Sequence, residues 1–471
     1  SSPRETGPRA DLVAADFGFL FLELRVQKAL LGLLSAVFCS FVCAQVNDQW
    51  KIIHAGSLLA DAREGARTEQ SIIVRNNFIV DVRDGYVEPS EVSGASNAKL
   101  IDLSSQFVLP GLIDSHTHIL SQQESNSREI RVTRSDELST LMGYEFGMRT
   151  LRAGFTTIRN VGGARNAIFA LRDAINQGIV IGPRIKAAGQ VITPTGGHGD
   201  GGGFRDDIFP HPHTGVCDGV TECRKAVRTQ VKFGADHIKY VATGGVLSLT
   251  ATGTEQQFTN EEQTALVQAA HAMGRKVAAH AHGKAGIMSA LLAGVDSIEH
   301  GSYLDEEVAN LFVRTGAYLV PTLIAGYTVE RIATEQPQFF IPAVRQKALE
   351  VGPIMRNALR IAHERGVKIA YGTDAGVNDH GTNAYEAVLM AEAGMPAREI
   401  LIAATINAAD LMSLTAVTGT IEAGKDADII AVRGNPLEDI SALMQPTFVM
   451  ARGNEINLAV PPLDLFPWPD L

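Results

Sequence analysis

The chain has 471 residues, of which 45% are hydrophobic, and a formal net charge of −11 with acidic and basic residues mixed along the sequence. This composition suits a globular protein with one very large core or two moderate ones, and nothing in it indicates extended disorder. The excess of acidic residues argues against nucleic acid or an anionic membrane as the main partner.

The N-terminal region has the pattern of a signal peptide. Arg25 and Lys28 precede an apolar run over residues 29–43, which is too short for a comfortable transmembrane span and is followed by polar residues. We expect cleavage near Ala44, export to the periplasm or the medium, and no stable membrane insertion afterwards. A buried N-terminal helix is the alternative. Residues 1–44 are therefore assigned to an upstream extension and signal peptide.

Four cysteines divide between this segment and the mature chain. Cys39 and Cys43 lie in the signal region, whereas Cys217 and Cys223 follow it. An oxidising compartment would allow the latter two to form a disulfide, and two unrelated thiols are the equal alternative. Without further cysteines or histidines beside them, the pair is poor evidence for a zinc site.

The two ends of the mature chain predict short β-strands. Residues 50–110 contain alternating apolar runs broken by Gly and Asn, and a similar texture returns over residues 419–454. Because chain ends often meet in space, we expect residues 45–110 and 415–459 to form one composite β-sandwich, followed by a tail over residues 460–471.

The middle of the chain, residues 111–414, alternates apolar strand candidates with helical patterns. Residues 261–273, for example, have a helical period and a suitable cap at Thr259. Eight such repeats predict an α/β fold, namely a (β/α)8 TIM barrel. The strand candidates are residues 109–113, 155–159, 184–188, 237–241, 276–280, 297–300, 318–322 and 368–373.

Metal-ligating side chains stand near the carboxyl ends of several predicted strands, which is the end where barrels of this kind carry their chemistry. A single strand histidine is more often a core or surface residue than a ligand, but the joint placement favours a metal site. The residues are His116 and His118 after the first strand, Lys239 in the fourth, His280 in the fifth, His300 in the sixth and Asp374 after the eighth.

The chemistry of these residue types predicts a centre with two divalent ions, for which zinc is the expected metal. Neutral imidazoles are typical zinc ligands. The ammonium of Lys239 can ligate only after carboxylation by CO₂, and the resulting N6-carboxylysine could bridge two ions. An ordinary buried lysine paired to an acid is the alternative. Asp374 is suited to accept a proton from the nucleophile and pass it to the leaving nitrogen, and without a metal it would be a salt-bridge or cap residue.

Six motifs follow one another along the chain: PGLIDSHTH at 110–118, DHIK at 236–239, AHAH at 279–282, IEHG at 298–301, GTD at 372–374 and GKDAD at 424–428. Their combination resembles the amidohydrolase superfamily, in particular the imidazolonepropionase-like and Xaa-Pro dipeptidase branch that includes ochratoxin-degrading amidases. The resemblance covers nearly the whole mature chain. It implies a two-metal centre in which His116, His118 and Asp374 hold one ion, His280 and His300 hold the other, and carboxylated Lys239 bridges them.

Candidates for substrate contacts are fewer. The glycine-rich loop over residues 195–203 follows the third strand on the active face, and its His198 is our first choice for a contact to the substrate or transition state. Tyr240 and Tyr327 are candidates for binding a substrate carboxylate, as tyrosines of similar dipeptidases do, with core packing as the equal alternative. His282 faces the same side as His280 and is a candidate for orienting it or for contacting the substrate.

Two other kinds of site are disfavoured. The glycine-rich loop lacks the GK[ST] ending of a phosphate-binding loop, and the chain has no GxSxG elbow for serine hydrolysis.

Together these observations predict a metal-dependent hydrolase that cleaves an amide bond to a C-terminal amino acid. The expected substrates are small: Xaa-Pro or other dipeptides, N-acyl amino acids, or ochratoxin-like amides. Alternatives are a cyclic amide, lactone or phosphotriester as substrate of the same centre and, outside enzymes, a catalytically silent structural or binding barrel. Because barrels of this type often associate, we also expect a homo-oligomer.

Overall fold

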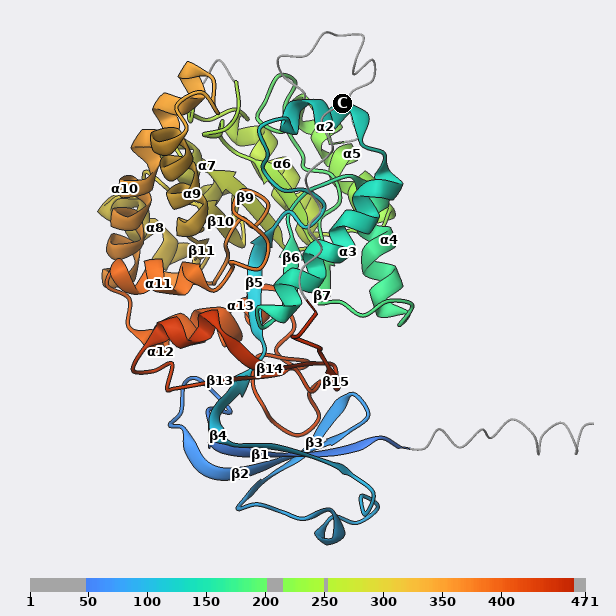
Figure 1. Ribbon diagram of the computed structural model, residues 1–471. Helices are drawn as coiled ribbons and strands as arrows, with labels where there is room; N and C mark the ends of the chain where they lie inside the picture. The colour runs from blue at the N-terminus through green and yellow to red at the C-terminus, as the bar shows by residue number, and fades with distance from the viewer. Residues whose placement is uncertain (1–47, 201–214, 250–252, 461–471) are drawn as a thin grey trace, which may run out of the picture. The chain divides into compact units, whose positions relative to one another are not determined.

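The computed structural model describes residues 48–200, 215–249 and 253–460 (Figure 1). The predicted signal peptide with its cleavage site near Ala44, the two signal-region cysteines, part of the glycine-rich loop and residues 461–471 of the predicted tail lie outside the described residues. Over the described ranges, every helix is too short or too polar to cross a membrane.

Strands from both ends of the described chain share one seven-stranded sheet, in the order β15-β14-β13-β4-β1-β2-β3. β1 and β4 are parallel, and the other neighbours are antiparallel. The strands are β1 (Trp50–Leu58), β2 (Arg67–Arg75), β3 (Phe78–Asp84), β4 (Lys99–Pro110), β13 (Ile429–Val432), β14 (Pro446–Ala451) and β15 (Asn454–Glu455).

Successive side chains of these strands pack on opposite faces of the sheet. Ile53 and Ile72 belong to one hydrophobic cluster, whereas their neighbours Ile52 and Ile73 belong to another. The predicted strands are therefore present. Two stacked sheets, which a sandwich requires, are not seen among the described residues, which contain a single sheet in this region.

The middle of the chain forms two parallel sheets, and the α/β class is confirmed. One has three strands in the order β5-β6-β7, and the other has five in the order β12-β11-β10-β9-β8. The strands are β5 (Leu112–Thr117), β6 (Phe155–Asn160), β7 (Arg184–Ala187), β8 (Ile238–Val241), β9 (Val277–Ala281), β10 (Ser297–His300), β11 (Tyr318–Val320) and β12 (Lys368–Ile369).

These strands pair in sequence order, but they do not close into one continuous ladder. Among the described residues, isolated parallel bridges join the two sheets, one between Ile192 and Tyr240 and one between Thr117 and Ala375. The strand predicted over residues 368–373 is shorter than expected, and Asp374 just after it has a left-handed backbone (φ 59°) that is incompatible with an extended strand.

The first predicted strand, residues 109–113, is divided between β4 and β5 at Gly111. A Cβ atom at Gly111 would lie 2.2 Å from Oγ1 of Thr156, so only glycine allows this close approach to β6. The chain passes from the seven-stranded sheet into the first parallel strand at this residue.

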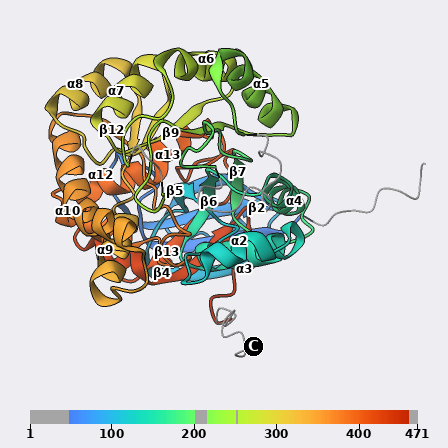
Figure 2. The same cartoon turned by 90° about the horizontal axis from the view of Figure 1, so that it is seen from above.

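Helices follow most of the parallel strands and surround them (Figure 2). Thr259 caps α6 as predicted, because its hydroxyl accepts the amide of Glu262 and the Glu262 carboxylate accepts the amide of Thr259. The α-helices are α2 (Ser127–Thr133), α3 (Asp136–Arg152), α4 (Arg165–Asn176), α5 (Gly219–Lys232), α6 (Asn260–His271), α7 (Lys284–Ala293), α8 (Glu306–Thr315), α9 (Leu323–Glu335), α10 (Pro342–Glu364), α11 (Tyr385–Glu392), α12 (Ala397–Ile402) and α13 (Ala408–Leu411).

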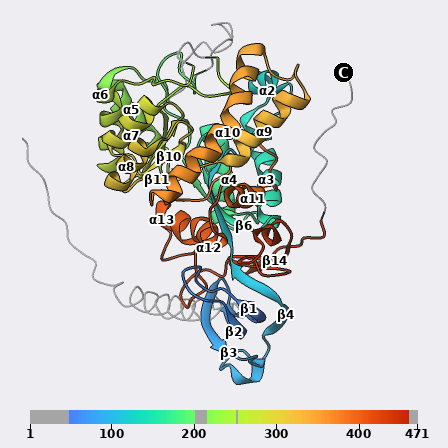
Figure 3. The same ribbon diagram turned by 90° about the vertical axis from the view of Figure 1, so that its left-hand side faces the viewer.

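Two features of the helical layer bear on the site. α9 and α10 lie alongside each other after β11 (Figure 3). Buried residues of the parallel strands and of the surrounding helices form one continuous hydrophobic cluster, which fixes the strand ends relative to the helices.

Candidate metal centre

All the predicted metal-binding residues line one cavity of about 200 Å³ near the carboxyl ends of the parallel strands. They come from different elements that are far apart in sequence. His116 lies in β5, Lys239 in β8, His280 in β9 and His300 at the end of β10, whereas His118 follows β5 and Asp374 follows β12.

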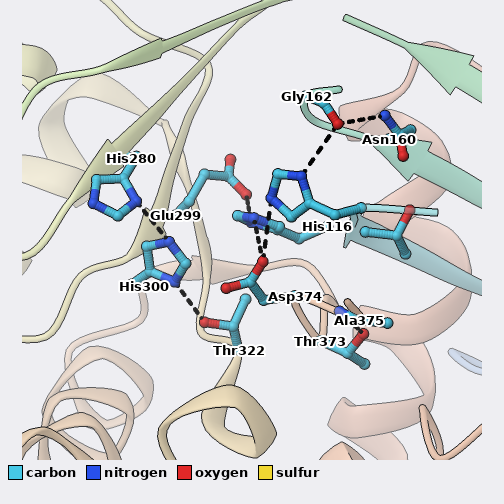
Figure 4. Close-up of polar contacts among 12 residues, drawn as sticks. His116, Asn160, Gly162, His280, Glu299, His300, Thr322, Thr373, Asp374 and Ala375 are labelled. Carbon is cyan, nitrogen blue, oxygen red and sulfur yellow. Dashed lines mark hydrogen bonds and ion pairs between the residues drawn. The ribbon is translucent and has the colours of Figure 1, made fainter. Parts of the chain in front are cut away.

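Asp374 contacts both histidines of the first group of candidate ligands, His116 and His118. Its Oδ1 lies 3.2 Å from Nε2 of His116 and 3.3 Å from Nε2 of His118 (Figure 4). The ligating atoms of His116, His300 and Asp374 all lie within 4.8 Å of one another. Burial raises the pKa of the Asp374 carboxyl, but His116 and His118 more than offset this and hold the pKa well below its usual range.

The second group consists of His280, His282 and His300, whose ligating nitrogens also lie within 4.8 Å of one another. Nδ1 of His280 and Nε2 of His300 are 2.9 Å apart. Burial lowers the pKa of all three imidazoles, that of His282 to about 3, so they are neutral and can offer a lone pair to a metal. The geometry thus adds His282 to the ligand candidates, although the motif pattern assigned it a supporting role.

Lys239 lies in the same cavity and is only 3% exposed. Burial lowers the pKa of its ammonium to about 8, although Glu299 and Asp374 act in the opposite direction. Among the described residues no ion pair to an acid is seen for Lys239, which disfavours the alternative of an ordinary buried salt bridge. A lysine with a lowered pKa has the neutral amine that carboxylation requires.

The sequence reasoning missed two buried charged residues next to His116. Nδ1 of His116 lies 2.7 Å from Oε2 of Glu299, and Nη2 of Arg159 donates to both carboxylate oxygens of Glu299 at 2.8 and 3.0 Å. Burial raises the pKa of Glu299, but Arg159 and His116 outweigh it and lower the pKa well below its usual range. A charged residue inside an apolar strand is the signal that would have identified both.

Asp114 was also missed, and it ties β5 to the segment that carries Asp374. Its carboxylate accepts the backbone N–H of His116 at 3.0 Å and both the N–H and the hydroxyl of Thr373 at 3.1 and 2.6 Å. Because Thr373 directly precedes Asp374, this buried carboxylate fixes the positions of His116 and Asp374 relative to each other.

His198 lies at the cavity as predicted. Its ring stacks on that of His280 with 4.3 Å between the ring centroids, and its backbone N–H donates to Gln257. Burial lowers the pKa of His198 to about 4, so the imidazole is neutral. It can therefore donate a hydrogen bond from one nitrogen to a ligand in the cavity.

The structure gives no support for Tyr240 and Tyr327 as substrate contacts, because neither residue lines the cavity. Successive strand residues face opposite sides, so Lys239 points into the cavity while the Tyr240 hydroxyl donates to Gln263 in α6 at 2.9 Å. Tyr327 is on α9 and stacks edge to face on Tyr385, with 5.4 Å between the ring centroids.

The rest of the cavity wall is apolar and comes mainly from helices α9 and α10 and from the loop after β8. Within the described residues, Lys239 and Asp374 are the ionisable side chains of the lining besides the histidines. The apolar residues are Val191, Val241, Val246, Leu247, Ala325, Gly326, Val329, Val351, Met355 and Val377.

Cys217 and Cys223 form a disulfide that lies outside the cavity wall. The backbone N–H of Cys217 donates to the carbonyl of Thr193, which opens the loop bearing His198. The disulfide therefore ties Cys217 to the first turns of α5, and the hydrogen bond to Thr193 connects Cys217 to the loop, so neither cysteine takes part in a metal site.

Comparisons with known proteins agree with this geometry. The model of the amidohydrolase family matches residues 107–456. Ochratoxinase of Aspergillus niger is 33% identical over 359 residues, which cover 73% of each chain.

Solved structures are similar along most of the chain. A Xaa-Pro dipeptidase with methionine bound in its active site is 42% identical with a TM-score of 0.82, covering 86% of this chain and 99% of that one. The structure of A. niger ochratoxinase is 29% identical with a TM-score of 0.75, covering 87% of this chain and 96% of that one. The chain therefore belongs to the amidohydrolase family and is a hydrolase that acts on amide bonds.

Proposed function

We propose that this protein is a two-metal amidohydrolase that cleaves the amide joining an acyl group or an amino acid to a C-terminal amino acid. The observation that carries the proposal is the convergence of six predicted ligand groups, from distant parts of the chain, on one buried cavity. A structural or binding protein would have no need for so many neutral imidazoles beside an ionised carboxylate.

The donor set fits two divalent ions. In the proposed arrangement His116, His118 and Asp374 would hold one ion, His280 and His300 would hold the other, and Lys239, as a carbamate, would supply oxygen donors to both. The two 4.8 Å clusters, His116–His300–Asp374 and His280–His282–His300, share His300 and so support two neighbouring ion sites, with His282 as a further donor candidate for the second. When bound, the ions, for which we expect zinc, would polarise the scissile carbonyl and make water a better nucleophile.

The proposed carbamate would form by reaction of the Lys239 amine with CO₂. Its neutral amine attacks CO₂, a C–N bond forms, and one proton is released to water, which leaves a carbamate with two oxygen donors. The lowered pKa of Lys239 supports this step because it increases the fraction of neutral amine.

Asp374 carries the proton in the reaction. Its carboxylate is ionised in the buried site and can take a proton from the attacking water, then return it to the nitrogen of the leaving amino acid as the C–N bond breaks. We assign to His198, which is neutral and stacked on His280, a hydrogen bond to the oxygen that becomes negative.

The apolar wall supports a substrate with an apolar side chain near the scissile bond. Val329 and Met355, from two helices, can contact such a group, whereas no described charged residue of the wall is left to pair with an ionic side chain. The relatives include an ochratoxinase and a Xaa-Pro dipeptidase with bound methionine. We therefore place apolar dipeptides, including Xaa-Pro, and N-acyl amino acids or ochratoxin-like amides first.

A substrate panel with metal analysis tests the function. The purified enzyme should contain close to two divalent ions per chain and hydrolyse apolar dipeptides or N-acyl amino acids. Turnover restricted to lactones, cyclic amides or phosphotriesters would remove the peptidase assignment. Protein without bound metal and without metal-restored turnover would contradict an enzyme of this type.

We also propose that the two parallel sheets are parts of one (β/α)8 barrel over residues 111–414. The bridges from Ile192 to Tyr240 and from Thr117 to Ala375 support closure because they link the free edges of both sheets. The seven-stranded sheet would then be the bent core of the proposed sandwich over residues 45–110 and 415–459.

Export and association are further parts of the proposal. The disulfide between Cys217 and Cys223 is consistent with an oxidising compartment and so supports export. N-terminal sequencing of the protein from its natural host would test cleavage near Ala44, and light scattering would test the expected homo-oligomer.

A further inference from the structure

The histidines of the centre differ in the group that forms a hydrogen bond with the ring nitrogen facing away from the cavity. His116 is paired with a carboxylate, whereas the partners of the others are uncharged in the part of the chain that the structure describes. Nδ1 of His116 meets Glu299 at 2.7 Å, Nδ1 of His118 meets the carbonyl of Gly162 at 3.2 Å, Nδ1 of His300 meets the hydroxyl of Thr322 at 2.8 Å, and Nε2 of His280 meets the carbonyl of Gly244 at 3.4 Å.

The carboxylate behind His116 is itself held by three hydrogen bonds. Arg159 donates from Nη2 to both oxygens of Glu299, and the hydroxyl of Ser297 donates to Oε1 at 2.5 Å. Arg159 is fixed in turn by its contacts to the carbonyl of Ser115 at 2.5 Å and to Ser297 at 3.1 Å. The side chains of His116, Glu299 and Arg159 are 1%, 0% and 3% exposed, so water does not compete with these bonds.

This arrangement determines how His116 presents its other nitrogen. Because a carboxylate only accepts hydrogen bonds, Nδ1 carries the proton and Nε2 has its lone pair directed at the cavity, where it lies 3.2 Å from Asp374. Charge-assisted hydrogen bonds are roughly twice as strong as neutral ones, and a carboxylate partner raises the basicity of a ligating imidazole.

We propose that Arg159 and Glu299 make the His116 half of the centre the tighter metal site, so that the two ions leave the protein in a fixed order. The inference rests on the proposed two-metal function. Glu299 and Arg159 touch neither the substrate nor an ion, and both are positioning residues that act through His116. The His280–His300 half, supported by the neutral Thr322 and Gly244, releases its ion first.

Chelator titration of the metal-loaded protein tests this order. The protein is dialysed against increasing concentrations of a metal chelator, and bound zinc per chain is measured by mass spectrometry of the metal. Wild type should lose its two ions in two separate steps. Glu299→Gln keeps the shape of the side chain but removes its charge, and it should shift the second, tighter step to about 10- to 100-fold less chelator while leaving the first step in place.

Thr322→Val is the matched variant for the other half. It removes the hydroxyl that contacts His300, and it should shift the first step while leaving the second in place. Arg159→Lys keeps the positive charge but loses the two-pronged contact to Glu299, and it should shift the tighter step by less than Glu299→Gln does.

Folding is controlled separately. The circular dichroism and melting temperature of each metal-free variant are compared with wild type, and Glu145→Gln serves as a buried glutamate variant outside the cavity, where Glu145 pairs with Arg149 on α3. If Glu299→Gln fails to fold, the shift of the tighter release step in Arg159→Lys decides whether the Arg159–Glu299 pair acts on the His116 site.

The outcomes separate the inference from the function. Suppose that wild type binds two ions and that a folded Glu299→Gln variant keeps both release steps or shifts both equally. The proposed role of Glu299 is then wrong, while the two-metal function stands. Wild type that binds one ion or none contradicts the two-metal function and the order of release with it.

Discussion

The floor and the wall of the cavity are built in different ways. The floor consists of short strand ends and the residues just after them, where buried imidazoles and carboxylates hold one another at distances of about 3 Å. The wall comes mostly from α9, α10 and a loop, and it offers methyl and thioether groups. Strand ends hold catalytic side chains in rigid positions. Side chains on the outer helices, by contrast, can be substituted without moving the residues of the floor. We therefore expect that mutations can change the substrate preference without changing the catalytic residues.

Removing the bridge should have the largest effect on the floor. Lys239→Ala eliminates the one lysine amine that lines the cavity among the described residues and so the proposed carbamate, and we expect kcat to fall by about 10³-fold or more together with metal content. Steady-state kinetics and metal analysis measure both. Kinetics like those of wild type would contradict the carbamate assignment.

Asp374→Asn should separate proton transfer from metal binding. The amide can still offer an oxygen to an ion but cannot take up a proton, so kcat should fall by about 10²- to 10³-fold while bound metal stays near the wild-type amount. Complete loss of metal would instead make Asp374 chiefly a ligand. The expected preference for apolar substrates should not change, because the wall is untouched.

A third prediction concerns Glu386, which contacts the start of α9 and should make the stability of the folded protein depend on pH. This buried carboxylate accepts the backbone N–H groups of Leu323 and Ile324 at the start of α9, and burial raises its pKa from 4.5 to about 8. The folded protein keeps the proton up to about pH 8, whereas the unfolded chain releases it near pH 4.5. Stability should therefore fall as the pH rises through this range, by on the order of a few kcal/mol.

Glu386→Gln removes this titration. The melting temperature of the metal-free variant should depend less on pH between 5 and 8 than that of the wild-type protein, while above pH 8 the variant should be the more stable of the two. Parallel melting curves for both proteins over the whole range would rule out the assigned proton. The floor residues titrate in both metal-free proteins alike, so the difference between the two curves, rather than the slope of either, reports on Glu386.

The smallest effect should come from narrowing the wall. A Cβ atom at Gly326 would lie 2.7 Å from Sδ of Met355, so this flexible side chain must shift in Gly326→Ala; because both residues line the cavity, we expect the added methyl group to narrow it. We expect kcat/KM for bulky apolar substrates to fall by about tenfold relative to alanine-containing ones, with bound metal unchanged. Equal losses for all substrates would show that Gly326 does not act through the size of the cavity.

Prediction from the sequence worked best where the signal is local. The HxH spacing of His116 and His118 and the position of His300 at the end of an apolar run depend only on strand geometry, and these residues line the cavity. The same alternation rule, applied to Lys239 and its neighbour, would have excluded Tyr240. Gly111 gave no sign that it ends one strand and begins another, since its role depends on contact with Thr156.

The amino-acid order alone was enough to establish the residue types of the centre and the alternation of strands and helices, because side-chain chemistry and period-two or helical patterns are properties of short segments. The pairing of Glu299 with His116 and Arg159, which are 183 and 140 positions away, was decided by the packing of the folded chain. The packing of the folded chain also determined which apolar residues line the cavity and that Tyr240 points away from it. Such contacts depend on how distant elements meet in three dimensions, and no local pattern encodes that meeting.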